Sequence, residues 1–329
     1  MHGKAFDVIG LGNSLVDILL ELSEGEFTPL GFERGTMRLV SPPEQKGLLD
    51  AFHSREPRLV SGGSVANSII ACSQLGGKGA FIGCVGDDRY GLHYSDEFNE
   101  LGIDFVNSPL VGEMTGTCVS IITPDAERTM RTSLAVSSHL AARHVPATKI
   151  ADAEWLFVEG YLFANPETGQ LAVHAAIEAA KAAGTKVALT CSDAFIPQVF
   201  GTPFREALKQ SELLFCNATE AMAVAGGSTA EEAFGNLKGM VPNAVVTDGP
   251  NGAFVRYNGT ECHVPAFPCK PVDVTGAGDM FAGAFLYGIT HGVAPEKAAR
   301  AGNFLAVKVI TQIGARLHTG SKESWSVHV

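Results

Sequence analysis

The sequence lacks the cysteine and histidine spacings of metal-binding and disulfide-rich proteins. Its seven cysteines include no Cys-x-x-Cys pair, and its ten histidines form no His-Glu-x-x-His motif. A zinc knuckle and a disulfide framework are therefore both disfavoured. Most of the cysteines lie in apolar segments such as Leu213-Leu-Phe-Cys216, so we expect them to be small buried side chains.

Long apolar runs and an excess of positive charge are also missing. The chain has no stretch of 18 apolar residues, and no apolar leader precedes the strand-like residues 6–9. Its formal charge is 24 − 35 = −11. We therefore expect a cytoplasmic protein that binds neither nucleic acid nor a membrane, and any anionic ligand must be bound by local groups.

Three familiar nucleotide-binding patterns are absent or broken. No Walker motif is present, because Gly76-Gly-Lys-Gly79 lacks both the hydroxyl residue and the upstream glycine, and the protein-kinase signatures are missing. In Gly10-Leu-Gly-Asn-Ser-Leu15, Leu15 replaces the third glycine of a dinucleotide fingerprint, and residues 14–20 continue as a strand pattern. These departures weaken the hypothesis of a dinucleotide-dependent oxidoreductase.

From about residue 154 onward, short β-type runs alternate with longer helical patterns. The expected strands are 155–158, 186–190, 213–215, 244–247 and 253–257, and the expected helices are 170–183, 204–210 and two that begin near Asp279 and Pro295. Gly184 follows the alanine-rich helix 170–183 as a typical C-terminal stop. This alternation predicts an α/β fold of the doubly wound type, with a mainly parallel sheet and helices on both faces.

Two earlier regions, about residues 15–40 and 106–133, break this rhythm with strand-like alternation and few helical windows. We expect them to form a small β-sheet lid over the carboxyl ends of the main strands, within a single domain of residues 1–329. The exposed edge of such a sheet offers a surface for a homodimer.

The segment Asp273-Val-Thr-Gly-Ala-Gly-Asp279 joins a glycine-rich turn to the start of a helix. The backbone N–H groups of Gly276, Ala277 and Gly278 can approach an anion closely, and the helix adds its positive end. A carboxylate in such a place repels the anion, but it is useful if Asp279 takes a proton from an attacking hydroxyl. Two interpretations stay open: a phosphoryl-transfer site, or a helix capped by an aspartate.

Two other segments offer groups for a polyol ligand. Asp17 interrupts an apolar strand pattern, so it needs either ligand hydroxyls, with Asn13 assisting, or a salt bridge. The run Gly62-Gly-Ser-Val-Ala-Asn67 opens a helix in which Gly62 and Gly63 let a ring lie against the backbone and Asn67 projects from the same face. The alternative for that run is a simple helix cap.

Further polar groups follow the later strands. Asn217 and Glu220 face the same way at a helix start, where they hold hydrated magnesium or form a capping box. The turn Thr247-Asp-Gly-Pro-Asn-Gly252 either contacts a nucleotide or only reverses the chain. Arg128 and Arg131 are candidates for neutralising a phosphoryl group.

Taken in this order, these segments resemble the ribokinase-type carbohydrate kinase family, also called the phosphofructokinase B family. Residues 62–91 are similar to its first signature and residues 273–286 to its second. The chain looks most like the adenosine kinase branch, on the basis of the segments Gly10-Leu-Gly-Asn-Ser-Leu-Val-Asp17, Gly116-Thr-Cys118, Glu159-Gly-Tyr161, Asn217-Ala-Thr-Glu220 and Arg300-Ala-Gly-Asn303.

The resemblance implies a ribokinase-like fold that transfers the γ-phosphoryl group of ATP to a hydroxymethyl group of a sugar or nucleoside. It implies that Asp279 is the base and that Gly276 to Gly278 form the anion hole. The implied acceptor site comprises Asn13, Asp17, Gly62, Gly63, Asn67, Arg128 and Tyr161, where Tyr161 stands at the place of a base-stacking aromatic. The implied nucleotide site comprises Asn217, Glu220, Thr247, Gly249, Gly252 and Asn303, with Mg²⁺ held by Glu220 through water.

Activation by K⁺ through backbone oxygens is a further implication of the resemblance. Val274 stands where the second signature more often has threonine. The alternatives to an adenosine-like acceptor are a pentose or hexose kinase of the same family and a non-catalytic nucleoside or sugar sensor.

Overall fold

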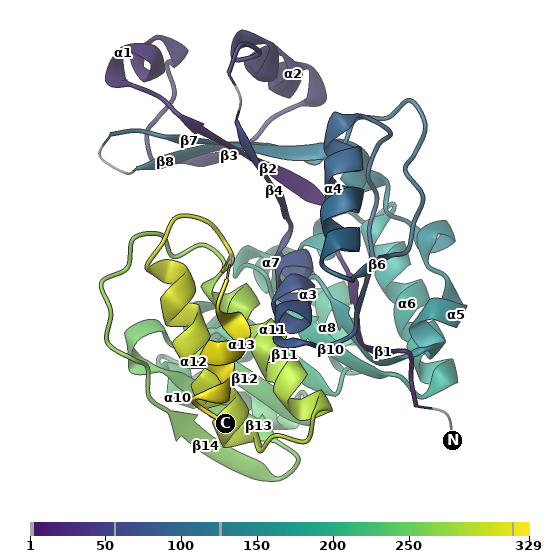
Figure 1. The fold of residues 1–329 in the computed structure, drawn as a ribbon. Helices are drawn as coiled ribbons and strands as arrows, with labels where there is room; N and C mark the ends of the chain where they lie inside the picture. The colour runs from purple at the N-terminus through teal and green to yellow at the C-terminus, as the bar shows by residue number, and fades with distance from the viewer. Residues whose placement is uncertain (1–2, 56, 125–126, 318) are drawn as a thin grey trace.

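The computed structural model describes residues 3–55, 57–124, 127–317 and 319–329. Two sheets organise these residues, a large one in the lower part of Figure 1 and a small one at the top. The large sheet has the strand order β14-β13-β12-β11-β10-β9-β1-β5-β6. Its strands are β1 (Phe6–Leu11), β5 (Gly79–Ile82), β6 (Asp104–Phe105), β9 (Ala153–Val158), β10 (Lys186–Thr190), β11 (Leu213–Asn217), β12 (Asn243–Thr247), β13 (Ala253–Tyr257) and β14 (Thr260–Val264).

Strands β6 to β12 of this order are parallel, whereas β13 and β14 are antiparallel additions at one edge. The prediction of a mainly parallel, doubly wound α/β fold is therefore confirmed. The predicted strand 253–257 coincides with β13.

Helices cover both faces of the large sheet, because side chains alternate along its buried strands. On β1, Val8 packs into one core cluster with the helices α3 (Ser64–Leu75), α4 (Arg89–Glu100), α11 (Ala277–Thr290), α12 (Pro295–Ile310) and α13 (Ser321–Ser326). Ile9 points the other way, into a second cluster with α5 (Ala147–Ala151), α6 (Gly169–Ala183), α7 (Phe195–Val199), α8 (Gly201–Leu208), α9 (Ala218–Ala225) and α10 (Ala230–Asn236). The expected helix 170–183 is α6, which ends at the left-handed Gly184.

The small sheet has the order β3-β8-β7-β2-β4. Its strands are β2 (Leu15–Glu21), β3 (Met37–Leu39), β4 (Arg58–Gly62), β7 (Gly116–Ile122) and β8 (Arg128–Ser133), and the short helices α1 (Glu24–Phe27) and α2 (Pro42–Ala51) accompany it. The two expected segments therefore contribute four strands. The fifth, β4, comes from outside both segments and leads directly into α3, so one strand joins the small sheet to the helix that faces the glycine-rich turn.

Candidate active site

Asp279 lies in the first turn of α11, where two side chains of α3 hold its carboxylate. The Ser64 hydroxyl donates to Oδ1 at 2.7 Å, and the Asn67 amide donates to Oδ2 at 3.0 Å. Burial raises the pKa of Asp279 to about 6, while these two hydrogen bonds favour the ionised form. Asp279 is therefore ionised at neutral pH but remains basic enough to accept a proton.

The turn before Asp279 has a backbone that only glycine can supply. Gly276 caps α11 at a φ of 79°, and a Cβ there would lie 2.1 Å from the carbonyl oxygen of Ala315. A Cβ on Gly278 would meet open space. The first amide groups of a helix have no partner within that helix. The Ala277 amide donates to the Val274 carbonyl oxygen at 3.4 Å, whereas those of Gly278 and Asp279 are available to an anion on this open side.

Two cavities meet at this turn. A cavity of about 210 Å³ is lined by residues that include Ser64, Thr190, Ser192, Asn217, Glu220 and Asp279. A larger one of about 710 Å³ is lined by residues that include Gly249, Gly252, Phe267, Asn303 and Val307. Thr247, Gly278 and Phe281 line both cavities. The larger cavity lies in the range typical of small-molecule sites, and the small one brings the carboxylate of Asp279 next to it.

Asn217 and Glu220 form the capping box that was one of the two interpretations of their spacing. The Glu220 amide donates to Asn217 Oδ1 at 2.9 Å, and Glu220 accepts from the Asn217 backbone and side-chain nitrogens at 2.9 and 2.8 Å. Burial raises the pKa of Glu220 to about 7, with a smaller contribution from Asp193 and Asp279. The cap and a ligand role are compatible, because Glu220 also lines the small cavity.

Asn13, Asp17, Gly62 and Gly63 lie close together. A Cβ on Gly62 would lie 2.9 Å from Asp17 Oδ2, and one on Gly63 would lie 2.1 Å from the Asn13 carbonyl oxygen. Gly63 adopts a φ of 109° at the N-cap of α3. The structure thus brings together four residues that the sequence offered as binders of ligand hydroxyls.

Asp17 is partly buried on β2, and its ionisation depends on distant charges. Burial raises the pKa of Asp17 to about 6, and the positive charges of Arg128 and Arg316 oppose this increase. Among the described residues no ion pair involves Asp17, so the two arginines act on it through longer-range attraction. Arg316 was not a sequence candidate, because it lies beyond both signatures and its approach to Asp17 depends on tertiary folding.

Glu159 was also missed as a site residue by sequence reasoning. Its carboxylate accepts from the Asn13 side chain at 2.6 Å, from the Asn13 amide at 3.3 Å and from the Val65 amide at 3.2 Å. Burial raises the pKa of Glu159 to about 7, although these hydrogen bonds lower it. The available signal was a carboxylate immediately after the apolar strand 155–158, in a position where parallel strands end.

The two candidate arginines have different surroundings. Arg128 pairs with Asp273 and donates to Thr275 Oγ1 at 3.3 Å and to Ser120 Oγ at 3.0 Å, so it links the small sheet to the glycine-rich turn. Arg131 is 5% exposed and stacks on Phe32 at 4.2 Å. Arg131 thus packs within the small-sheet region, and its contact with a phosphoryl group stays a prediction.

Tyr161 lies in the short 3₁₀ helix Gly160–Ala164, beside Phe195 at a ring-centroid distance of 6.3 Å. Burial raises the pKa of the Tyr161 hydroxyl, and the charges of Asp193 and Glu159 add to this effect. This aromatic pair therefore lies near Glu220 and Asp279, the two carboxylates that line the small cavity.

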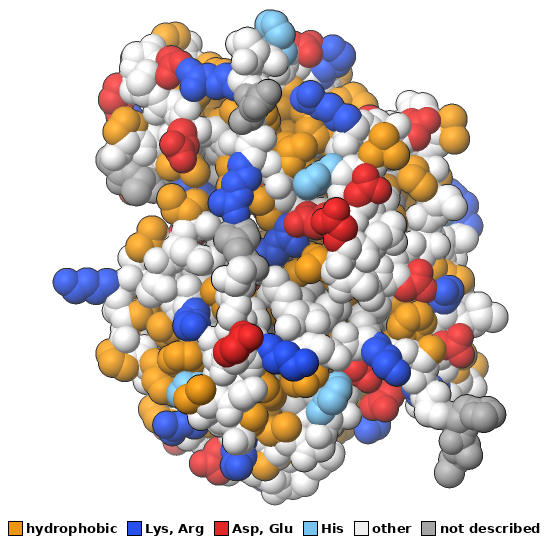
Figure 2. All heavy atoms as spheres, in the orientation of Figure 1, with side chains coloured by type: hydrophobic (Ala, Val, Ile, Leu, Met, Phe, Trp, Pro, Cys, Tyr) orange, Lys and Arg blue, Asp and Glu red, His pale blue; other side chains and the backbone are white. Residues whose placement is uncertain are grey.

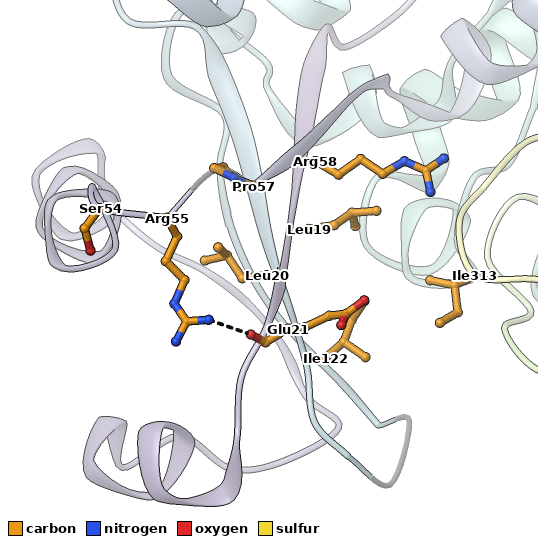
Figure 3. A pocket seen from close by; sticks show the side chains of 9 residues that line it. All are labelled: Leu19, Leu20, Glu21, Ser54, Arg55, Pro57, Arg58, Ile122 and Ile313. Atoms are coloured by element: carbon orange, nitrogen blue, oxygen red, sulfur yellow. Dashed lines mark hydrogen bonds between the residues drawn. The ribbon is translucent and has the colours of Figure 1, made fainter.

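A further cavity, of about 690 Å³, lies against the small sheet and is drawn in Figure 3. Leu19, Glu21, Arg58 and Ile122 line it from three strands, and Ile313 faces it from the loop after α12. None of the predicted site residues is among those that line it.

Within the described ranges, no group of three or more histidine, cysteine, aspartate or glutamate side chains is arranged to hold a metal ion. All seven cysteines are free, and five of them are buried. Among the same residues, every helix is too short or too polar to cross a bilayer.

Comparisons with known proteins agree with this architecture. The family model described as pfkB family carbohydrate kinase matches residues 38–320. The ribokinase of Haemophilus influenzae is 29% identical over 79% of this chain and 84% of its own length, and adenosine kinase 1 of Arabidopsis thaliana is 25% identical over 95% and 97%. The crystal structure of adenosine kinase from Sinorhizobium meliloti has a TM-score of 0.86 at 29% identity, covering 99% of this chain and 100% of that one.

Proposed function

Because the chain belongs to the pfkB family of carbohydrate kinases, and is a phosphotransferase with an alcohol group as acceptor, we propose that it transfers the γ-phosphoryl group of ATP to a hydroxymethyl group of an adenosine-like nucleoside or a sugar. Asp279 is the general base, and the turn Gly276 to Gly278 is the anion hole.

The position of Asp279 carries this proposal. It lies in the small cavity, one residue from Gly278, which also lines the large cavity. An acceptor hydroxyl beside Asp279 therefore faces a triphosphate that extends from the large cavity over the turn. Asp279 takes the hydroxyl proton as the acceptor oxygen forms its bond to the γ-phosphorus, and the bond to the bridging oxygen of ADP breaks.

The larger cavity suits the nucleotide. Thr247, Gly249, Gly252 and Asn303 line it, as the sequence hypothesis requires. Asn303 donates to the carbonyl oxygens of Val264 and Pro265 at 3.2 and 3.1 Å, so its side chain fixes the wall of the cavity. Its contribution to nucleotide binding is therefore to keep this wall in place.

Glu220 provides a carboxylate suited to outer-sphere contact with Mg²⁺, because it lines the small cavity and its backbone nitrogen is already satisfied by the cap. When bound, Mg²⁺ supplies positive charge to the phosphate oxygens. Asn217 holds the Glu220 carboxylate in place for this contact. The K⁺ activation implied by the resemblance stays a prediction, and it is tested by comparing turnover in potassium and tetramethylammonium salts.

The acceptor is held by the group of residues around Asn13 and Asp17. The side-chain oxygen of Asn67 is buried and has no hydrogen-bond partner among the described residues, while its nitrogen donates to Asp279. A hydroxyl group of the acceptor would satisfy that oxygen and lie next to the base. Tyr161 and Phe195 provide an aromatic surface that favours a nucleoside over a plain sugar.

The small sheet acts as a lid in this proposal. Arg128 ties it to Asp273 in the glycine-rich turn, and an incoming triphosphate competes for the same guanidinium.

The edge strand β3 exposes Met37 and Leu39, which are 57% and 61% exposed, and it is the surface on which we place a homodimer. A protein that elutes as a monomer at micromolar concentration would contradict the dimer but not the kinase.

The proposal is tested by incubating the protein with ATP, Mg²⁺ and a panel of nucleosides, pentoses and hexoses, and by measuring ADP release. We expect Mg²⁺-dependent ADP release with one class of acceptor. Turnover with sugars alone would identify the pentose or hexose kinase alternative. Ligand binding without ATP consumption by any acceptor would identify the non-catalytic sensor and overturn the proposal.

A further inference from the structure

Arg316 is a buried cation in the loop between α12 and α13, outside every motif used above. Its side chain is 5% exposed and donates to Glu97 Oε1 at 2.8 Å. A buried charge is tolerated only when it is paired, so the geometry of this guanidinium is fixed by Glu97 on α4. Figure 2 shows charged side chains of both signs gathered where the small sheet meets the rest of the molecule.

Helix α4 in turn holds the strand that carries the glycine pair. Glu97 Oε2 accepts the Ser61 amide at 2.8 Å, and the Tyr94 hydroxyl donates to the Gly62 carbonyl oxygen at 3.2 Å. Ser61 and Gly62 are the last residues of β4, immediately before Gly63. Two hydrogen bonds from one helix therefore fix the segment on which the acceptor is proposed to lie.

The neighbours of Arg316 contact the opposite side of the site. The Gly314 amide donates to Asp273 Oδ2 at 2.9 Å, and Ala315 lies directly against Gly276. Gly314 and Ala315 thus contact the segment that carries the anion hole through their backbone, and the next residue, Arg316, is linked to the acceptor segment through Glu97. The distance between the two halves of the site is set partly by this short segment.

We propose that Arg316 is a positioning residue for the acceptor, because it locks Glu97 and through it the segment from Ser61 to Gly63. This inference rests on the proposed assignment of Gly62, Gly63 and Asp17 to acceptor binding. Arg316 also acts on Asp17 through its charge. Burial raises the pKa of Asp17, and the negative charge of Asp273 adds to this increase, whereas the positive charges of Arg128 and Arg316 lower it. Although burial alone would raise it, the pKa of Glu97 is also lowered, by Arg316 and by hydrogen bonds from Ser61.

Arg316→Gln tests the proposal, with Arg256→Gln as a matched control. Arg256 is 7% exposed and donates to the carbonyl oxygens of Pro242, Phe234 and Val241, far along the chain from the acceptor residues. Both substitutions remove a buried guanidinium, so both lower the melting temperature. Only Arg316→Gln is expected to raise KM for the acceptor, by roughly 10- to 100-fold, with KM for ATP changed less than about threefold.

Three further variants separate positioning from simple destabilisation. Glu97→Gln keeps the side-chain volume, so it folds if Arg316→Gln does not, and we expect a smaller increase in acceptor KM of about three- to tenfold. Arg316→Lys is expected to recover part of the loss because it keeps the charge but not the two-nitrogen fork. The double variant with both Gln substitutions should be no worse than Arg316→Gln alone, since both residues act through one contact.

An unchanged acceptor KM in Arg316→Gln or Glu97→Gln, or an equal rise in KM for ATP, would overturn the positioning role while leaving the kinase assignment intact. Absence of ATP consumption by the unsubstituted protein with every acceptor would overturn the proposed function and, with it, this inference.

Discussion

Asp279 and Asp17 have nearly the same pKa, about 6, but the two regions that hold them control it by different means. In the α/β body, two neutral donors on α3 contact Asp279 directly. At the small sheet, the charges of Arg128 and Arg316 act on Asp17, and each of these arginines is itself paired with another carboxylate.

Under the proposed function, the difference teaches how one site can combine a fixed base with an adjustable acceptor pocket. The hydrogen bonds to Asp279 come from the single buried helix α3, so they would persist if the small sheet moved relative to the α/β body. The charges around Asp17 come from β8 and from the loop after α12, so they change when either segment shifts. Salt and lid position should therefore affect acceptor binding more than proton transfer.

The largest expected effect comes from Asp279→Asn, which removes the base but keeps the shape of the side chain. Turnover should fall by roughly 10²- to 10⁴-fold, while the acceptor still binds, because general-base catalysis is lost and the cavity is preserved. The measurements are kcat in the ADP-release assay and acceptor binding by calorimetry. Near-normal turnover would reject Asp279 as the base.

Arg128→Gln tests the charge-controlled side and should lower kcat/KM by roughly 10- to 100-fold. The loss of this positive charge also raises the pKa of Asp17. As the pH is lowered, Asp17 of the variant therefore becomes protonated earlier, and acceptor binding should begin to weaken at a higher pH than in the unsubstituted protein. Arg131→Gln is the control, because Arg131 stacks on Phe32 and donates to the carbonyl oxygens of Thr36 and Met130 in the small-sheet region. Equal kinetic losses in both variants would contradict the distinction between the two arginines.

Ser64→Ala tests the hydrogen-bond-controlled side. The base must be deprotonated to act, so kcat should fall as the pH decreases through about 6 in the unsubstituted protein. Removing one donor to the carboxylate raises the pKa of Asp279, so this fall should begin at a higher pH in the variant, with only a few-fold loss at pH 8. A pH–rate profile of both proteins measures the shift, and superimposable profiles would contradict the role of Ser64.

The smallest effect concerns stability. The folded-state pKa of Asp279 is about 6 against an ordinary value of 3.8, so its ionised form costs folding free energy that is fully present above pH 6 and absent below pH 3.8. At pH 8 the free energy of unfolding of Asp279→Asn should therefore exceed that of the unsubstituted protein by on the order of 1–3 kcal/mol, with a higher melting temperature, and this advantage should disappear toward pH 4. Calorimetric melting at the two pH values checks this, and a pH-independent difference would contradict it.

Most of the fold was predictable from local pattern. The helix α6 and the strand β13 were located within one residue, because alanine content, Gly184 and β-branched or aromatic residues are local signals. The membership of β4 in the small sheet was not predictable. Its pairing with β2 joins segments far apart in the chain, and no periodicity in residues 58–62 identifies that partner.

The site was predictable in part, for the same reason. Glycine-rich turns and polar residues at strand ends indicate where a ligand can approach, and the structure places Asn217, Glu220, Thr247, Gly278 and Asp279 around two adjoining cavities. Their contacts were not predictable, because Ser64 and Asp279 lie 215 residues apart and Glu159 and Asn13 lie 146 apart. Arg316 carries no motif at all, and only its tertiary pairing with Glu97 gives it significance.

The close packing of Gly276 against Ala315 has a consequence for synthesis on the ribosome. Gly276 and Asp279 leave the exit tunnel before the loop that supports them, so a nascent chain that already contains both signatures still has an unsupported turn. Proteolysis within α12 would leave the same defect in a finished molecule. A fragment ending there would retain every signature residue and yet have no carbonyl group beneath its glycine turn.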